Sequence, residues 1–228
     1  MAPDSMPETA VNDVTPEMLV GQKFLFPIGH YIGAYHPGTD EPLAYHTVRI
    51  GRTPTRLTSD AEFTLWALSH GLTGDDAVRP WGRDEVLRVA ERERVDQAPR
   101  LLDELIGEDI IIEVAAGTPD AIEFAKAHRV VPLMFGIGQT SEDPPRNGIG
   151  LGSQVVLEVT NMAYELWRFG HLAGDLWQFA QLHSEALGAT AGLPREMTQP
   201  DQLLLGFFWE LQRMLAHNVV YLDSAPES

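Results

Sequence analysis

The fold is decided by the stretch LTSDAEFTLWAL, which covers residues Leu57 to Leu68. Ser59, followed three residues later by Glu62, forms a capping box, in which the two side chains satisfy free backbone N–H groups at the start of a helix. The apolar residues that follow are Phe63, Leu65, Trp66 and Leu68. Gly71 can adopt the left-handed conformation that commonly ends a helix. The stretch therefore predicts a helix that begins after Ser59 and ends before Gly71.

Two further helices and two strands are predicted around it. Residues 83–93 place apolar side chains on one face and alternate arginine with acidic residues on the other, which is typical of a surface helix. A third helix stops at Gly107 and should bury Leu101, Leu102, Leu105 and Ile106. Residues 110–114 form a short apolar run that predicts a strand. Residues 43–50 are rich in aromatic and β-branched side chains and predict an earlier strand.

This order of one strand, three helices and a strand hairpin over residues 43–114 is typical of a winged-helix unit. The LTSDAEFTLWAL stretch, Gly71 and the segment LLDELI (residues 101–106), which runs into an apolar strand, also resemble the pyrroloquinoline-quinone D-type peptide chaperones. Members of that family are recognition elements that hold leader peptides during ribosomal-peptide maturation. The resemblance implies a winged-helix-like module that binds a peptide.

The second half of the chain is predicted to be mainly helical. The helices are expected at residues 118–128, 162–167, 175–187 and 200–217. Short strands are expected at residues 130–135 and 154–159. Between these strands, the glycine-rich segment Gly136–Gly152 is predicted to be a binding loop or a mobile connection.

The last predicted helix carries apolar side chains on two sides. One stripe at a spacing of four residues consists of Leu203, Phe207, Leu211 and Leu215. Leu205 and Trp209 project from a different side. Such a helix is either fully buried or forms a self-association surface. Leu205 and Trp209 are therefore the candidate contacts of a homodimer.

The predicted fold class is α+β, mainly helical, with an N-terminal winged-helix-like module and a C-terminal helical region that contains a few short strands. The chain of 228 residues suits one large domain or two small ones. We expect a flexible acidic tail (1–20), the winged-helix-like module (21–117) and the mainly helical C-terminal region (118–228).

Composition excludes several classes of function. The chain contains no cysteine, which rules out disulfides, thiol nucleophiles, iron–sulfur clusters and cysteine-based zinc sites. The formal net charge is −17, which disfavours attraction to phosphate backbones or anionic lipid. Residues 1–17 lack the basic and apolar parts of a secretory signal, and no apolar stretch reaches the roughly 20 residues that cross a bilayer. We expect a cytoplasmic protein without a membrane partner.

No motif for catalysis or for a cofactor is complete. His30, His36 and His46 match no familiar ligand spacing, so we expect no metal site. The glycines of residues 136–152 lack the third glycine of a dinucleotide-binding turn and the lysine of a P-loop. Ser153 does not stand in a nucleophile elbow. We expect no cofactor and no catalytic residue, although a small-molecule enzyme that uses residues 136–152 as a lid remains an alternative.

The leading hypothesis is a non-catalytic protein that binds a protein or peptide partner, such as a recognition element in peptide maturation. An extended peptide would add to an exposed strand edge and place its side chains in a groove beside the third helix. The residues expected to contact this partner are Val48, Ile50, Arg100 and Glu104.

The main alternative is a winged-helix transcription regulator with a C-terminal dimerisation or sensor region. A small cationic run, formed by Arg49, Arg52 and Arg56, can contact a few phosphates. Residues 1–117 nevertheless hold ten lysines and arginines against twenty acidic residues, a net charge of −10. Because this balance repels phosphates, nucleic acid is the less favoured partner.

Overall fold

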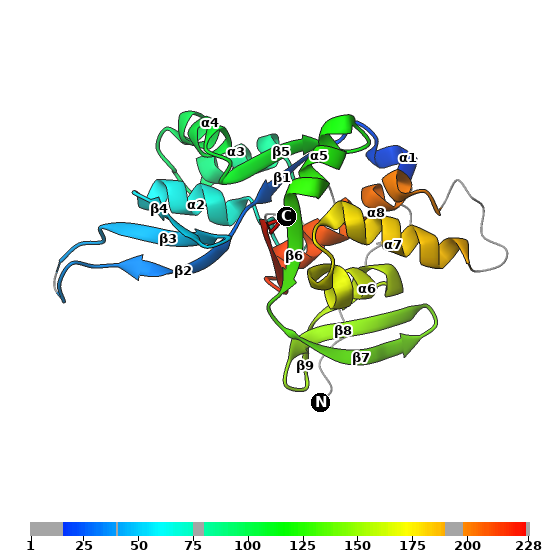
Figure 1. The fold of residues 1–228 in the computed structure, drawn as a ribbon. Helices are drawn as coiled ribbons and strands as arrows, with labels where there is room; N and C mark the ends of the chain where they lie inside the picture. Colours follow the sequence, from blue (N-terminus) through cyan, green and yellow to red (C-terminus); the bar gives the residue numbers. More distant parts are fainter. Residues whose placement is uncertain (1–15, 40, 75–79, 190–197, 227–228) are drawn as a thin grey trace.

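The structure is a computed structural model that describes residues 16–39, 41–74, 80–189 and 198–226 (Figure 1). Within these ranges the helices are α1 (Pro16–Leu19), α2 (Asp60–Leu68), α3 (Arg83–Arg92), α4 (Ala98–Gly107), α5 (Pro119–Ala127), α6 (Asn161–Phe169), the 3-10 helix η2 (Gly170–Leu172), α7 (Leu176–Gly188) and α8 (Pro200–Ala216). The strands are β1 (Lys23–Pro27), β2 (His30–Tyr35), β3 (Tyr45–Ile50), β4 (Thr53–Leu57), β5 (Ile111–Ala115), β6 (His128–Pro132), β7 (Phe135–Glu142), β8 (Pro145–Leu151), β9 (Gln154–Val159) and β10 (Val220–Ser224).

The fold is α+β, and the prediction that it is mainly helical is wrong. Helices make up 43% and strands 30% of the described structure. The strands form small antiparallel sheets, in the orders β1-β5, β10-β6, β2-β3-β4 and β7-β8-β9. The helices lie above and beside these sheets, and the β2-β3 hairpin projects away from the rest of the molecule (Figure 1).

Much of the unpredicted strand lies in the glycine-rich segment Gly136–Gly152, which is a hairpin and not a loop. A Cβ atom at Gly150 would overlap the carbonyl oxygen of Gln154, and one at Gly136 would overlap the hydroxyl of Tyr164. The glycines therefore allow neighbouring strands and α6 to approach closely. Because glycine has no side chain, it also hides the alternation by which a strand is recognised in a sequence.

Helix α2 forms where the sequence predicts it. The hydroxyl of Ser59 accepts a hydrogen bond from the backbone N–H of Glu62 at 3.2 Å. The Glu62 carboxylate accepts one from the backbone N–H of Thr58 at 2.5 Å, and so the return bond of the capping box falls one residue earlier than expected. Helix α2 packs on α3 and α4, and the three helices share one apolar cluster with Leu57 at the end of β4.

The strand hairpin expected after the third helix is not formed. Strand β5 is followed by α5, and its partner is β1, which lies about ninety residues earlier, with Lys23 opposite Ala115. The three-stranded sheet of this region instead precedes the helices, as β2, β3 and β4. The winged-helix pattern over residues 43–114 therefore predicts the three helices correctly, but it places the strand hairpin after them, whereas the sheet precedes them.

Strand β1 joins the two halves of the molecule, the N-terminal half around α2, α3 and α4 and the C-terminal half around α5 to α8. Its side chains alternate between two apolar cores, as the pleat of a strand requires. Phe24 and Phe26 lie in the core of the C-terminal helices, where both rings contact Phe208 edge-on. Leu25 points the other way, into the cluster built by α2, α3 and α4.

The two-sided hydrophobicity of α8 is satisfied inside this chain. Helix α8 packs against α1, α6 and α7. Leu205 is only 2% exposed, and Trp209 is partly buried against the same core. Leu205 is therefore not available for the predicted self-association, because α1 and the turn at Gly117 cover it.

The predicted tail, residues 1–20, lies mostly outside the described residues. Its described part begins at Pro16 and forms α1, and Leu19 is buried in the core with α8. None of the helices in the described ranges has the length and apolarity needed to cross a bilayer.

A pair of buried hydrogen bonds ties the two halves together. The side chain of Gln212 accepts a bond from the Trp81 backbone N–H and donates one to the Trp81 carbonyl oxygen, both at 2.7 Å. Both residues are buried, so water cannot replace either bond.

We predict that Gln212→Leu lowers the free energy of unfolding by about 2–4 kcal/mol, because it leaves a buried N–H and a buried carbonyl unpaired. Urea titration followed by circular dichroism measures the change. Gln181→Leu, at an exposed position of α7, is the matched control and should have almost no effect. Equal stability of the two variants would show that the Gln212 bonds do not hold the halves together.

Candidate functional site

The residues predicted to bind a partner do not form one surface. Val48 is fully buried, and Ile50 is partly buried on the same strand. Strand β3 is the central strand of its sheet, paired with β2 on one side and β4 on the other. Both edges of β3 are paired, so a peptide cannot add as a further strand beside Val48 and Ile50, the residues predicted to contact it.

Arg100 and Glu104 are exposed on α4 and form an ion pair with each other. Arg100 also donates a hydrogen bond to the side chain of Gln97 at 2.9 Å. Helix α2 packs on both α4 and β3 and lies between them (Figure 1). Arg100 and Glu104 on α4 are thus separated by α2 from the two predicted contact residues on β3.

His30, His36 and His46 each interact with a different partner. His30 packs against the ring of Tyr221, with centroids 5.0 Å apart. His36 bonds to the carbonyl oxygen of Glu41 at 3.2 Å. His46 bonds to the Asp60 carboxylate at 2.9 Å and stacks on Phe63. Across the described residues, no group of three or more histidine and acidic side chains is arranged to hold a metal ion.

Strand β2 offers an open edge. Within the described residues it pairs with β3 on one side, and beyond the parallel bridge at Ile28 no strand pairs with its other side. Ile32 and Tyr35 on this strand are 55% and 48% exposed. The opposite edge strand, β4, carries Pro54, which has no N–H to offer to a further strand. The open edge suited to pairing is therefore that of β2.

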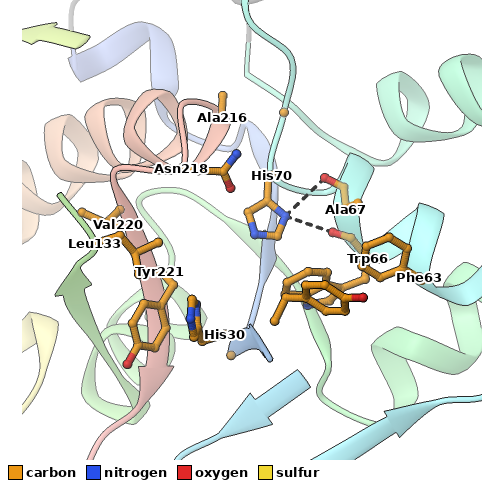
Figure 2. Close-up of a pocket in the computed structure, with 13 residues that line it drawn as sticks. His30, Phe63, Trp66, Ala67, His70, Leu133, Ala216, Asn218, Val220 and Tyr221 are labelled. Carbon is orange, nitrogen blue, oxygen red and sulfur yellow. Dashed lines mark hydrogen bonds between the residues drawn. The ribbon is translucent and has the colours of Figure 1, made fainter. Parts of the chain in front are cut away.

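A pocket of about 390 Å³ lies at the inner end of this edge, where β2 meets α2 and β10 (Figure 2). We call it the His70 pocket. From β2 and α2 it is lined by His30, Tyr31, Phe63, Trp66, Ala67 and His70. From the C-terminal half it is lined by Leu133, Ala216, Asn218, Val220 and Tyr221. Two regions far apart in sequence thus build its walls.

His70 closes the C-terminal end of α2. Its Nδ1 lies 3.1 Å from the carbonyl oxygen of Trp66 and 3.2 Å from that of Ala67, in the last turn of the helix. The Ala67 carbonyl also accepts from the backbone N–H of His70. Because a carbonyl can only accept, Nδ1 carries the proton and donates. Burial lowers the pKa of His70 from 6.5 to about 4, although its bonds to these carbonyls act in the opposite direction. His70 is thus neutral at pH 7, with an unprotonated Nε2 on the pocket side (Figure 2).

Tyr221 is held against the pocket by a buried ionic network. The Arg49 guanidinium donates to the Tyr221 hydroxyl at 2.9 Å. Asp223 is 1% exposed and lies 3.6 Å from both Arg49 and Arg129. The Asp223 carboxylate also accepts from the backbone N–H of Gly51 at 2.5 Å. The network fixes the ring of Tyr221 and joins the β3-β4 turn to β10.

The chemistry of the pocket is that of a binding site for an uncharged group. None of the lining residues is an acid, a lysine, an arginine, a serine or a threonine. Burial also lowers the pKa of His30, and the nearby positive charge of Arg49 lowers it further, which favours a neutral imidazole there too. Residues 136–152 do not line this pocket, so it gives no support to their predicted role as a lid.

No motif in the sequence marks this pocket. The only local signal was a histidine four residues after Trp66 and directly before Gly71, the position of a helix C-terminus. An exposed histidine at that position usually stabilises the helix when it is protonated, because its positive charge interacts favourably with the helix dipole. The pocket beside His70 is also lined by Ala216 and Tyr221, which no local pattern connects to it.

We predict that stability falls as the pH drops from 6.5 toward 4. In the folded protein His70 is protonated only near pH 4, whereas in the unfolded chain it is protonated near pH 6.5. The contribution of neutral His70 to the free energy of unfolding is therefore fully present above pH 6.5 and decreases as the pH falls below it. The loss from His70 amounts to about 1.4 kcal/mol per pH unit. Burial also lowers the pKa values of His128 and His183, which add to the slope.

Urea midpoints at pH 7 and pH 5 measure this effect. His70→Gln keeps a side-chain donor for the α2 carbonyls but does not titrate, so it should show a shallower loss of stability than the unaltered protein. An identical pH dependence of the two proteins would contradict the assignment of a neutral, buried His70.

Comparisons with protein-family models, with curated proteins and with solved structures find no match to this chain. The function therefore has to be argued from the geometry of β2 and the His70 pocket.

Proposed function

We propose that this protein binds an extended segment of a partner polypeptide along the open edge of β2, with one uncharged side chain of that segment in the His70 pocket. The observation that carries the proposal is the position of the pocket at the inner end of a strand that has one open edge. An edge strand supplies main-chain hydrogen bonds to any extended peptide, and an adjacent pocket supplies selectivity for one side chain.

The packing of α2 leaves room beside β2. Where helix α2 meets the β2-β3-β4 sheet, it contacts mainly β3 and β4. In β3, Val48 and His46 are buried, whereas β2 has no fully buried residue. The apolar surface left on β2 includes Ile32 and Tyr35, which a paired peptide would cover. Covering such surface is favourable by roughly 25 cal/mol per Å².

Charge favours a neutral or basic segment over an acidic one. The whole chain has a net charge of −17, which attracts basic partners at long range. The pocket itself is uncharged, so a carboxylate that entered it would lose its hydration without gaining a cation. A segment with an uncharged residue at the pocket position and basic residues near it fits both conditions.

The proposal retains the kind of function that the resemblance to the peptide chaperones implies, but it changes the location. The strand is β2 instead of β3, and the side-chain pocket lies at the end of α2 instead of beside α4. The resemblance itself remains a prediction.

The transcription-regulator alternative also remains a prediction, and no contact among the described residues favours it. Several cations of the N-terminal half already have partners. Arg83 bonds to Asp103 and Glu113, and Arg56 lies over the ring of Tyr45 with its guanidinium 4.4 Å from the centroid. Fewer charges are then left to meet phosphates.

The test blocks the β2 edge with proline. The carbonyl of Tyr35 accepts from the N–H of Ala44, so Tyr35 faces β3 and the N–H of Ala34 faces outward. Ala34→Pro removes that outward donor without removing a bond inside the sheet. Peptides selected from a display library of linear sequences against the full chain should bind this variant at least about tenfold more weakly, since pairing loses a main-chain bond and meets the proline ring.

Arg56→Pro, at the opposite edge of the same sheet, is the matched control and should bind the selected peptides like the unaltered protein. Fluorescence anisotropy of the labelled peptides measures both affinities. The proposal fails if the library yields no binding peptide, or if Ala34→Pro binds the selected peptides as tightly as the control does.

A further inference from the structure

The His70 pocket has walls of aromatic rings. The rings of Tyr31 and Phe63 lie 4.8 Å apart on one side. Trp66 meets the edge of His70, with centroids at 4.6 Å and planes at 78°. Aromatic groups pack on such walls in offset or edge-on arrangements, which add to the stabilisation from burial. The pocket is therefore suited to a flat ring.

The polar atoms of these aromatic residues are already used. His46 donates from Nε2 to the Asp60 carboxylate, and its Nδ1 shares a hydrogen bond of 3.1 Å with the Tyr31 hydroxyl. The indole N–H of Trp66 donates to the carbonyl oxygen of Ile28 at 3.2 Å. A ring that binds in the pocket can thus pack on the faces and edges of the wall residues, but it finds few free hydrogen-bonding groups there.

His70 is different, because one of its ring nitrogens, Nε2, has no hydrogen-bond partner among the described residues. Nδ1 is committed to two backbone carbonyls, and no described residue bonds to Nε2. With Nδ1 as the donor, neutral imidazole leaves Nε2 as an acceptor only. His30 and Asn218 also line the pocket without a side-chain bond in the described structure, but each of them can donate or accept. Of these three residues, only His70 has its hydrogen-bonding role fixed by the fold.

A fixed acceptor selects its ligand. A carboxylate can only accept and would face the lone pair of Nε2, which is repulsive. An ammonium group could donate, but no carboxylate in the lining would balance its charge. Phenylalanine would fill the volume but leave Nε2 without a partner, a cost that discriminates against ligands lacking a donor. An uncharged ring that carries an N–H or O–H group satisfies both the walls and the acceptor.

We infer that the side chain held by the His70 pocket is an aromatic ring with a hydrogen-bond donor, such as the indole of tryptophan, and that Nε2 of His70 accepts from that donor. This inference rests on the proposed function, since it names the residue that anchors the bound segment. The volume of about 390 Å³ is at the lower end of the range for small-ligand pockets and leaves space for a two-ring system.

The test compares two probes that differ by one methyl group. N-acetyl-tryptophanamide has the indole N–H, whereas its 1-methyl-indole analogue has the same ring system without the donor. Both are titrated into the full chain, and binding is followed by NMR of protein labelled with ¹⁵N at histidine. The parent probe should bind about fivefold to tenfold more tightly, and only it should shift the Nε2 resonance of His70 toward that of a hydrogen-bonded acceptor.

A pocket-filling variant locates the binding. Ala67→Phe places a ring in the pocket from α2 and should abolish saturable binding of the parent probe. Thr64→Phe, on the same helix but outside the lining, should bind it like the unaltered protein. Neither change removes the hydrogen bonds of His70.

Equal affinities for the two probes, or no saturable binding of either, would overturn the inference. The peptide selection separates this failure from that of the proposed function. If the selected peptides depend on the β2 edge but carry no tryptophan or tyrosine, the proposed function stands and the inference about the side chain does not.

Discussion

The close approach of Gly29 to its neighbours is the constraint on which the site depends. Its φ of +94° is one that other residues rarely adopt, and a Cβ atom there would lie 2.7 Å from the carbonyl oxygen of Arg49. The N–H of Gly29 donates to the carbonyl of Leu222 at 2.7 Å. This bond holds β10 at the start of β2 and allows the ring of Tyr221 to pack on His30. The end of the chain can therefore form a wall of a pocket whose other wall is α2.

His70 links the local structure of α2 to the chemistry of that pocket. Its Nδ1 proton is donated to carbonyls in the last turn of α2, so the same interaction that caps the helix also fixes the tautomer. Burial keeps the ring neutral, and the open nitrogen becomes a permanent acceptor. The rings around it contribute shape and apolar surface. Recognition of an uncharged donor thus follows from how α2 ends.

The sequence predicted what depends on neighbouring residues and missed what depends on distant ones. The cap of α2 at Ser59 and the apolar stripe of α4 are local, and both were predicted. Whether Val48 lies at an edge or in the centre of a sheet depends on whether β2 and β4 both pair with β3, which no local pattern shows. The pairing of β1 with β5 and the α2 and β10 walls of the His70 pocket join segments about 90 or more residues apart, so no periodicity signals them. For the same reason, the exposed edge and the pocket could not be found before the fold was known.

Amide hydrogen exchange of the full chain, with and without a peptide selected for binding, tests the central claim most directly. If the peptide adds to β2 as a further strand, the outward-facing amides of residues 31–35 become protected, while those of β4 and α4 exchange as before. Protection confined to β4 and α4, with none on β2, would contradict the account.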